Sequence, residues 1–512
     1  MSTASRLISG SAASWMRIGI TMLSQIALVP LYLNYWSVET YGVWLAIQAL
    51  VAIMTMMDLG HQTFLGYEFL KFGKDKTSEL SQYLWSGASV GLAIGALQIL
   101  VIVGFIYTGA LPYLLGISEL EEIALIETAG LVLLLQGIVW LIASSTGGLF
   151  VRALEPFGYF PRMAWWGVFT TLVVNLAPAL ALTIGAGLLE TGVVTAVSTI
   201  LINIPLYIDM FRLMRKERIN FTTPSFRIGY KNFIRSTAIA GKLLLENARQ
   251  QGVRLVLAPL SGAAGLAAFS TMRTGSNVAL QGLNTITNPL MPDLMRFLHA
   301  RDQIRSEAAF GTVWIVVVAL MAPAVVVLQV FIGPLFSLWT QGRIPFDPSL
   351  FAILSLTVLV YAVAQPAMAV VLGNNLIKPQ LILSVLAAVT VIGGIIFLVP
   401  LIGILGAGVA LLAAELVASA GYTYWATGWL RKNTLYWPIR SFVIASSSVI
   451  VAGASMWCMI LLPELKWVTF TITMVLLVWN LWRYWQVLPL VVTQHARHIL
   501  NKVPGFKKLF FV

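Results

Sequence analysis

Long apolar stretches separated by short polar segments make up most of this chain. A stretch of about 20 apolar residues is long enough to cross the hydrocarbon core of a bilayer as one helix. Fourteen stretches meet this length, at residues 11–34, 40–64, 84–108, 123–150, 163–186, 189–211, 236–259, 264–291, 310–333, 349–372, 379–400, 403–427, 440–462 and 466–485. The pattern predicts an all-α polytopic membrane protein with about 14 transmembrane helices.

The composition indicates that a bilayer is the solvent. Of the 512 residues, 59% are hydrophobic and 10% are charged, whereas soluble domains carry about 25% charged residues. No polar segment is long enough to form a soluble catalytic domain. The single cysteine, Cys458, excludes an intramolecular disulfide. We find no metal-site spacing and no phosphate-binding glycine loop, so we expect no cofactor and no enzymatic activity.

The net charge of +12 is distributed unevenly. Most Lys and Arg residues fall in the two tails and in alternate loops, whereas the opposite loops hold only Arg343 and Lys466. Basic residues accumulate on the cytoplasmic side of membrane proteins, so this pattern predicts an even number of spans with both termini in the cytoplasm. It also explains the basic charge without a nucleic-acid partner. The basic segment 212–242 is expected to contact the head groups of anionic phospholipids.

Short segments of the first half recur in the second half. Residues 27–33 (ALVPLYL) resemble 255–261 (LVLAPLS), and 188–197 resemble 404–413. Transporters often contain such repeats, so we predict two pseudo-symmetric six-helix bundles. The predicted parts are an N-terminal lobe at 1–215, a cytoplasmic linker at 216–235, a C-terminal lobe at 236–430, and two additional helices with a basic cytoplasmic tail at 431–512.

A polar stripe runs along the predicted helix at 264–291. Its members recur at spacings of three and four, which places them on one helix face. They are Ser270, Arg273, Asn277, Gln281, Asn284 and Asn288. Arg273 falls near the bilayer midplane, where a charge is costly and usually faces the protein interior. The stripe either lines a substrate path or joins helices through amide hydrogen bonds.

Three more arginines, Arg17, Arg249 and Arg254, fall inside predicted spans. Arg17 either faces the same path as Arg273 or extends to the cytoplasmic interface. Together these side chains would form a cationic cavity. Guanidinium groups bind phosphate in bidentate geometry and stay charged at any relevant pH. Such a cavity suits the diphosphate of a lipid carrier, and the amides of the polar stripe suit sugar hydroxyls.

Three carboxylates are candidates for binding a coupling ion, either H⁺ or Na⁺: Asp58, Glu246 and Glu415. Glu246 is spaced for an ion pair with Lys242 on the same helix. Glu415 lies in mid-span without an evident partner on its own helix. It either carries a proton or makes a structural hydrogen bond or ion pair. Asp58 is expected at the cytoplasmic end of its span, where it would anchor a loop.

Several short motifs resemble the multidrug/oligosaccharidyl-lipid/polysaccharide exporter (MOP) superfamily, and within it the polysaccharide-transporter branch. These are Pro30-Leu31, the segment 41–44 (YGVW), the segment 58–60 (DLG), the segment 265–269 (GLAAF) and the segment 288–292 (NPLMP). Their order and spacing extend over roughly residues 10–430. The resemblance implies a V-shaped, two-lobed flippase that works by alternating access.

The resemblance also implies a cargo and partners. The cargo would be an undecaprenyl-diphosphate-linked repeat unit of O-antigen or exopolysaccharide, moved across the bacterial inner membrane. A polysaccharide polymerase and a chain-length regulator would be partners. Lipid II flippases of the superfamily use arginines in spans 1 and 8, which match Arg17 and Arg273. Fourteen spans depart from the twelve usual for repeat-unit flippases and fit lipid II flippases, whose last two helices hold the lipid tail.

Other functions compete with this interpretation. A lipid II flippase and a cation-coupled multidrug exporter would share the fold, although a drug pocket should be acidic or aromatic. A membrane polysaccharide polymerase or ligase would need a large extramembrane loop, and the longest predicted outer loop, 334–348, holds only Arg343 and Asp347 as charged residues. A scramblase would depend on neither Glu415 nor an ion gradient.

Overall fold

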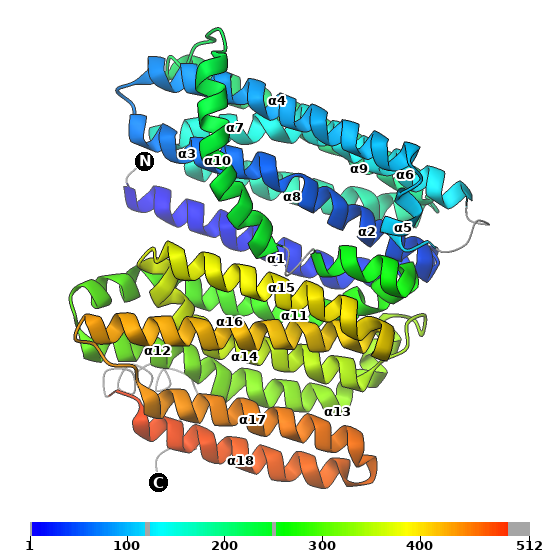
Figure 1. Cartoon of the computed structure of the whole chain (residues 1–512), viewed down its shortest axis with the longest axis vertical. Coiled ribbons are helices and arrows are strands. Elements are labelled where there is room, and N and C mark those ends of the chain that lie inside the picture. Colours follow the sequence, from blue (N-terminus) through cyan, green and yellow to red (C-terminus); the bar gives the residue numbers. More distant parts are fainter. Residues whose placement is uncertain (1–2, 118–122, 248–251, 490–512) are drawn as a thin grey trace. The chain divides into compact units, whose positions relative to one another are not determined.

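The computed structural model describes residues 3–117, 123–247 and 252–489, and the regular structure in these ranges is helical throughout. The long helices, shown in Figure 1, are α1 (Thr3–Tyr35), α2 (Val38–Met54), α3 (Met56–Phe72), α4 (Thr77–Tyr107), α6 (Ile123–Val139), α8 (Phe160–Thr183), α9 (Leu188–Lys216), α10 (Phe226–Asn247), α11 (Val253–His299), α12 (Gln303–Val316), α13 (Ala322–Trp339), α14 (Pro348–Gly373), α15 (Ile377–Ile402), α16 (Ile404–Lys432), α17 (Ile439–Leu461) and α18 (Lys466–Val487). This confirms the predicted all-α fold class.

Twelve described helices are long and apolar enough to cross a membrane, and the bent pair α2–α3 brings the number to thirteen. Each of them falls on a predicted span. The chain is therefore a multi-pass membrane protein. The remaining predicted span, 236–259, corresponds partly to α10, which is not among the thirteen. Its many charges explain this: Arg227, Lys231, Arg235, Lys242 and Glu246.

The chain forms two compact units. Unit 1 comprises Met1–Thr274, Trp339–Ile344 and Ile395–Ile404, and unit 2 comprises Gly275–Leu338, Pro345–Gly394 and Leu405–Val512. By packing, α10 and the first part of α11 belong to unit 1, although the repeat in the sequence assigns them to the second lobe. The helices α17 and α18 belong to unit 2.

Unit 1 is a bundle in which α1 packs on α8, α8 and α6 pack on α9, and α3 packs on α4 and α10. One apolar cluster of this unit is formed by residues from α3, α4, α9 and the short helix α7 (Thr146–Leu154), including Leu65, Phe69, Leu84, Phe150 and Met210. The span 123–157 is continuous through a π-helical turn, η2 (Trp140–Ser145), which joins α6 to α7.

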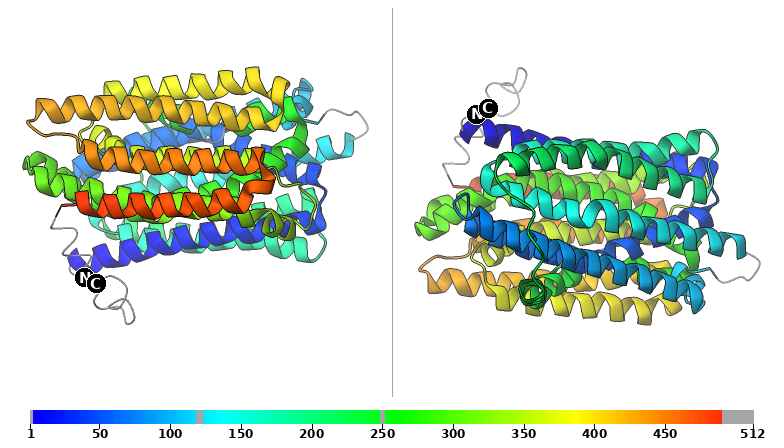
Figure 2. Two further views of the ribbon diagram at one scale, coloured as in Figure 1. Left: turned by 90° about the horizontal axis from the view of Figure 1, so that it is seen from below. Right: turned by 90° about the horizontal axis from the view of Figure 1, so that it is seen from above.

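The helix α10 crosses α3 and α4 at a steep angle in Figure 1, and the right-hand view of Figure 2 looks nearly along its axis. It begins at Phe226, before the predicted start at 236, and ends at Asn247. The backbones touch where it crosses α3. A Cβ atom built on Gly60 would lie only 2.4 Å from Cα of Ala240. Glycine is therefore required at this crossing.

At two helix interruptions in unit 1, the freed backbone group is hydrogen-bonded to another element. The bend of 40° between α2 and α3 occurs at Thr55, and there Gln98 Nε2 of α4 donates a hydrogen bond of 2.7 Å to the carbonyl of Met54. Within α11, Gly262 has a φ of 73° and breaks the helix. The amide of the next residue, Ala263, donates to the carbonyl of Gly116 at 3.0 Å.

Unit 2 is centred on α14, which is the most buried of the candidate spans. In its most apolar stretch, 72% of the residues are buried inside the protein. The left-hand view of Figure 2 shows α17 and α18 side by side, and α17 packs on α14. Polar contacts hold α18 in place. Tyr484 Oη donates to the carbonyl of Gly311 at 2.9 Å, and Thr473 Oγ1 donates to Ser455 Oγ of α17 at 2.8 Å.

The crossing of α3 and α10 gives a stability prediction. We expect Gly60→Ala to lower the thermal unfolding temperature in detergent, because the added methyl group must push α10 away, at a cost of about 1–3 kcal/mol. Gly241→Ala is the matched control, since no atom lies within 4 Å of the position of its new Cβ. Equal unfolding temperatures for the two variants would contradict the close packing.

Candidate functional site

The polar stripe predicted for span eight lies on α11. This helix is uninterrupted from Ala263 to His299, so the spacing places Arg273 and the amides on one face. Arg273 is buried, with 6% of its side chain exposed. Asn277, Gln281 and Asn284 are half-buried. Arg273 is thus enclosed within unit 1, whereas the three amides belong to unit 2 and are partly accessible there.

Arg254 belongs to the helical segment before the break at Gly262. It interacts electrostatically with Tyr41 of α2, whose hydroxyl faces Thr271 of α11. Tyr41 is 4% exposed. It therefore links the segment that carries Arg254 to the helix that carries Arg273. The sequence analysis used Tyr41 as a family motif and did not assign it to the site.

The aromatic neighbours of Tyr41 explain its fixed position. Its ring stacks on the ring of Tyr32 with centroids 5.4 Å apart. The ring centroids of Tyr32 and Trp36 are 5.0 Å apart. Trp36 Nε1 in turn donates to the carbonyl of Ala186 at 3.0 Å. Next to Tyr41, a Cβ on Gly42 would lie 1.9 Å from the carbonyl oxygen of Ala263. The motif at 41–44 therefore packs directly on the start of the continuous part of α11.

The remaining predicted arginine in the described part of the chain, Arg17, lies beside α8. Arg17 is exposed on α1, and its guanidinium lies close to Gly167 of α8. The hydroxyls predicted to share its face bond to their own helix, since Thr21 Oγ1 donates to the carbonyl of Arg17 at 2.9 Å and Ser14 Oγ to that of Gly10 at 3.0 Å. Arg249 lies outside the described residues.

Two of the candidate acids have partners on their own helices. Glu246 pairs with Lys242 at 3.7 Å, and both side chains are more than a third exposed. This confirms the predicted ion pair. Glu415 is 4% exposed and accepts a hydrogen bond from Ser419 Oγ at 3.4 Å. The expectation that Glu415 has no partner on its own helix is therefore wrong, because Ser419 lies one turn further along.

Asp58 does not lie at the end of its span. The bent span runs from Val38 to Phe72, so Asp58 is close to its middle, and the side chain is completely buried. The expectation of a loop-anchoring position at the cytoplasmic end is wrong because the helix continues beyond residue 64. Asp58 Oδ2 accepts two hydrogen bonds, from Gln62 Nε2 at 3.0 Å and from Trp140 Nε1 at 2.8 Å.

His61, one turn beyond Asp58, connects three helices. Its Nε2 lies 3.3 Å from the carbonyl of Gly87 on α4, and its Nδ1 lies 3.1 Å from Ser236 Oγ on α10. Because a carbonyl only accepts, Nε2 carries a hydrogen. His61, Gln62 and Asp58 are all buried. We call these three residues with Trp140 and Ser145 the mid-span node; Ser145 was not among the predicted site residues.

A separate cluster fixes α8 to α9 at one end of unit 1. Arg162 donates to both carboxylate oxygens of Asp209, at 2.8 and 2.5 Å, and Trp166 Nε1 donates to the same carboxylate at 2.9 Å. Nearby, Tyr159 Oη donates to Glu217 at 2.6 Å, and this bond raises the pKa of Tyr159. The sequence pattern did not reveal these pairs, because the partners are far apart along the chain.

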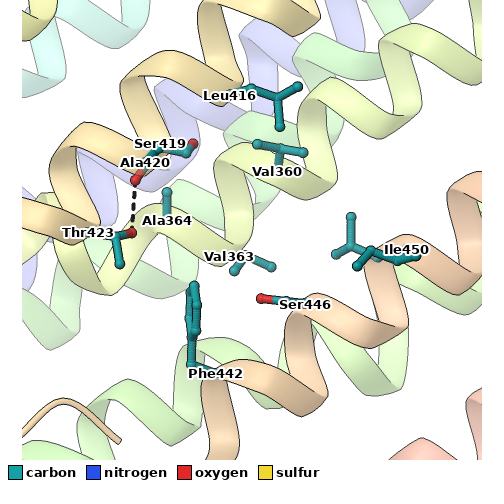
Figure 3. Close-up of a pocket in the computed structure, with 11 residues that line it drawn as sticks. Val360, Val363, Ala364, Leu416, Ser419, Ala420, Thr423, Phe442, Ser446 and Ile450 are labelled. Atoms are coloured by element: carbon teal, nitrogen blue, oxygen red, sulfur yellow. Dashed lines mark hydrogen bonds between the residues drawn. The ribbon is translucent and has the colours of Figure 1, made fainter. Parts of the chain in front are cut away.

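An open apolar cavity of about 340 Å³ lies between α14, α16 and α17 of unit 2 (Figure 3). Val360 and Val363 of α14 face Phe442 and Ile450 of α17 across it. The hydroxyl of Thr423 is already bonded to the carbonyl of Ser419 at 2.8 Å. The cavity wall is therefore mostly hydrocarbon, and it suits an aliphatic chain.

Comparisons with known proteins agree on the fold. No protein-family model and no curated relative matches this sequence. Among solved structures, "Lipid II flippase MurJ, inward closed conformation" is similar with a TM-score of 0.63 at 12% identity, covering 91% of this chain and 98% of that one. An outward-facing multidrug resistance MATE family transporter of the MOP superfamily matches with a TM-score of 0.53 at 15% identity, covering 84% of this chain and 96% of that one.

A MOP superfamily transporter from Pyrococcus furiosus matches with a TM-score of 0.53 at 14% identity, over 84% of this chain and 96% of that one. For that transporter, the reversed polarity of the binding pocket suggests a different function. All three proteins are membrane transporters or flippases of one structural class. This chain has the fold of the MOP superfamily transporters.

Proposed function

We propose that this protein is a flippase for a polyprenyl-diphosphate-linked oligosaccharide. The observation that carries the proposal is Arg273, an arginine that is only 6% exposed on a membrane-spanning helix. An enclosed charge inside a bilayer is retained where function requires it. Guanidinium is the side chain best suited to a diphosphate, because it offers paired donors at any physiological pH.

The neighbouring amides extend the same face toward a sugar. Asn277, Gln281 and Asn284 follow Arg273 along α11 and are partly accessible. Each amide offers both donors and an acceptor, so together they can pair with hydroxyl groups of varied orientation. Arg17, Arg249 and Arg254 remain proposed diphosphate ligands, with Arg254 held beside Tyr41. We expect the aliphatic carrier to remain in contact with the bilayer or to use an apolar cavity such as that between α14, α16 and α17.

The identity of the glycan is a further part of the proposal. The motifs in the sequence favour a repeat unit of O-antigen or exopolysaccharide, carried on undecaprenyl diphosphate in the bacterial inner membrane, with a polymerase and a chain-length regulator as partners. The specific observation in favour of lipid II is the structural similarity to a lipid II flippase over 91% of this chain. A vesicle assay with both lipid-linked substrates would distinguish the two cargoes.

We further propose that transport alternates between two lobes, that both termini are cytoplasmic, and that an ion gradient drives the cycle. Glu246 and Glu415 remain candidate ion-binding residues. Glu415 is the better placed of these two, because it is buried on a spanning helix, whereas Glu246 is exposed and already paired. A multidrug exporter of the same fold would instead depend on acidic or aromatic residues in its pocket.

Arg273→Ala tests the proposal directly. We expect this variant to lose about 10- to 100-fold of the transport rate for a fluorescent polyprenyl-diphosphate sugar in proteoliposomes. A hydrogen bond to a charged group contributes about 1.5–3 kcal/mol. Arg343→Ala is the control, because Arg343 is exposed in a loop. Normal transport by Arg273→Ala at normal expression would refute the assignment.

The amides should contribute through the sugar. We expect Asn277→Ala and Gln281→Ala each to raise the apparent KM by about 2- to 12-fold, since a neutral hydrogen bond contributes about 0.5–1.5 kcal/mol. Gly275→Ala adds a methyl group in open space on the opposite side of α11 and should leave the KM unchanged. The expected effects should shrink with a polyprenyl diphosphate that lacks sugar. Equal effects on both substrates would show that the amides do not bind the glycan.

A further inference from the structure

The helix α10 contacts α3 and α4 at one level of the bundle. At its start, the amide of Ser225 donates to Ser86 Oγ of α4 at 2.9 Å. Further along, its backbone packs against Gly60 of α3. These two crossings lie at the same level, because His61 of α3 is only 3.3 Å from the carbonyl of Gly87 on α4. The steep angle in Figure 1 agrees with this, so α10 runs close to the plane of the membrane that α3 and α4 span.

Aromatic residues place the start of α10 near the membrane surface. The first turns of α4 are polar, and Tyr83 and Trp85 follow them. Trp85 Nε1 donates to the carbonyl of Asn220 at 3.0 Å, and its ring centroid lies 4.8 Å from that of Phe221. Tyr and Trp concentrate at the boundary between the head groups and the hydrocarbon. Because α10 first touches α4 at the next residue, Ser86, it begins at this boundary.

The side chains of α10 form three faces. The narrow buried face packs on α3 and α4 and consists of Gly229, Asn232, Ser236 and Ala240. A basic face is exposed and consists of Arg227, Lys231 and Arg235. A mostly apolar face has members at spacings of three and four: Phe226, Tyr230, Ile234, Thr237, Gly241 and Leu244. At 3.6 residues per turn, the basic and apolar faces form the two flanks of the exposed side. This pattern is typical of a helix that lies in the membrane interface.

The basic face has no acidic counterpart in the described part of the protein. No ion pair or hydrogen bond of the Arg227, Lys231 or Arg235 side chains occurs there. The acid on the same helix, Glu246, pairs with Lys242 at 3.7 Å. The three cations lie within about 12 Å along the helix, at 1.5 Å per residue. Basic groups at the membrane surface attract anionic head groups.

A groove of about 420 Å³ lies along the apolar face of α10. It is open, and its walls come from α10, from the bend between α2 and α3, and from α4. The lining includes Met54, Met57, Leu97, Val101, Gly241 and Leu244. Leu97 and Val101 lie beyond Ser86 along α4, on the side of the hydrocarbon core. The groove therefore extends from the interface into the apolar part of the bilayer.

Two polar side chains line the groove, and both are hydrogen-bonded to backbone. Gln98 Nε2 donates to the carbonyl of Met54, and Thr237 Oγ1 donates to that of Ile234, each at 2.7 Å. The remaining lining is apolar, and its methionine side chains can adapt to chains of different shape. The volume falls in the range of about 300–1,000 Å³ that is usual for ligand pockets. An aliphatic chain is therefore a suitable occupant.

We propose that α10 and this groove bind an anionic phospholipid of the bilayer. Arg227, Lys231 and Arg235 hold the phosphate of the head group, and an acyl chain passes over the exposed side of α10 into the groove. This narrows the contact expected of the basic segment 212–242 to one site with a basic face and a chain groove. The site shares no residue with the proposed cargo site at Arg273, so it does not depend on the proposed function.

The combination of the two faces favours a phospholipid over other anions. A soluble phosphate would use the basic face and leave the groove exposed. An acidic peptide would have no access to a groove that extends into the hydrocarbon. A phospholipid carries a phosphate and an acyl chain in one molecule, and the two flanks of α10 are adjacent. Lys and Arg side chains on an interfacial helix extend toward water, which brings their charges to the depth of the lipid phosphates.

Photo-crosslinking tests the site in the purified full-length chain. The protein in detergent is incubated with phosphatidylglycerol that carries a diazirine on its acyl chain, and the labelled peptides are mapped. We expect adducts at residues 53–57, 94–101 and 237–244. Phosphatidylcholine with the same chain has no net charge and should label these segments at least about 5-fold less, the factor expected for one basic residue. Equal labelling by the two lipids would overturn the proposal.

Charge variants separate a site from general attraction to a basic surface. The triple variant Arg227→Gln, Lys231→Gln and Arg235→Gln should reduce labelling by phosphatidylglycerol by about 10- to 100-fold. The matched control removes the same charge from exposed residues at and after the end of α9, through Arg212→Gln, Arg215→Gln and Arg218→Gln. It should keep wild-type labelling. An equal loss in both variants, or no loss in the first, would overturn the site.

Groove variants test the position of the acyl chain. Gly241→Phe places a ring in the open space of the groove and should remove the adducts at residues 94–101. Ala238→Phe is the control, because Ala238 is exposed on the same helix and does not line the groove. Adducts that persist in Gly241→Phe would contradict the chain position.

Competition identifies the occupant. Unlabelled phosphatidylglycerol should displace the label. Displacement by a polyprenyl diphosphate but not by phosphatidylglycerol would assign the groove to the carrier chain of the cargo and would overturn the phospholipid site. If the wild-type protein is labelled as expected but moves no lipid-linked sugar in proteoliposomes, the phospholipid site stands and the proposed function fails.

Discussion

Inside a bilayer, every backbone donor and acceptor must find a partner within the protein, and this requirement governs where the helices of unit 1 break. At Thr55 the freed carbonyl of Met54 is taken by Gln98. At η2 the carbonyl of Ser144 is taken by Gln62. At these two irregularities the partner is a polar side chain from a neighbouring helix, whereas at Gly262 the partner is a backbone carbonyl. Two of the buried polar residues of this unit, Gln62 and Gln98, are thus the partners of its broken helices.

The same requirement explains why glycine occurs where helices cross. At Gly60 and Gly91 an added side chain would meet a neighbouring helix, so the helices approach closely enough for short polar side chains to reach across. His61 can contact α4 and α10 together only because Gly87 and Ser236 bring both elements near. Close packing and polar contact thus depend on each other in this bundle.

Hydropathy alone predicted the fold class and located thirteen of the spans. A long apolar helix can be recognised from its own segment of sequence, without knowledge of its partners in the fold. The polar face of α11 was also predictable, since its spacing is periodic. The node around Asp58 was not. Asp58 and Trp140 come from distant segments of the chain. The sequence placed Asp58 at a helix end because the second half of its span is polar and follows a bend at Thr55, so the predicted span was too short. That the arginines converge on one cavity stays a prediction; in the structure Arg17 lies close to α8, and Arg254 interacts electrostatically with Tyr41.

The missing side chain at Gly91 has a consequence for what the centre of unit 1 can take up. The space in front of it is bounded by Ser145 Oγ and Asp58 Oδ1, so close that a single methyl group would not fit without movement. Any residue larger than glycine at position 91 would have to displace Ser145 or Asp58, so the polar contacts at the centre of unit 1 depend on the absence of a side chain here.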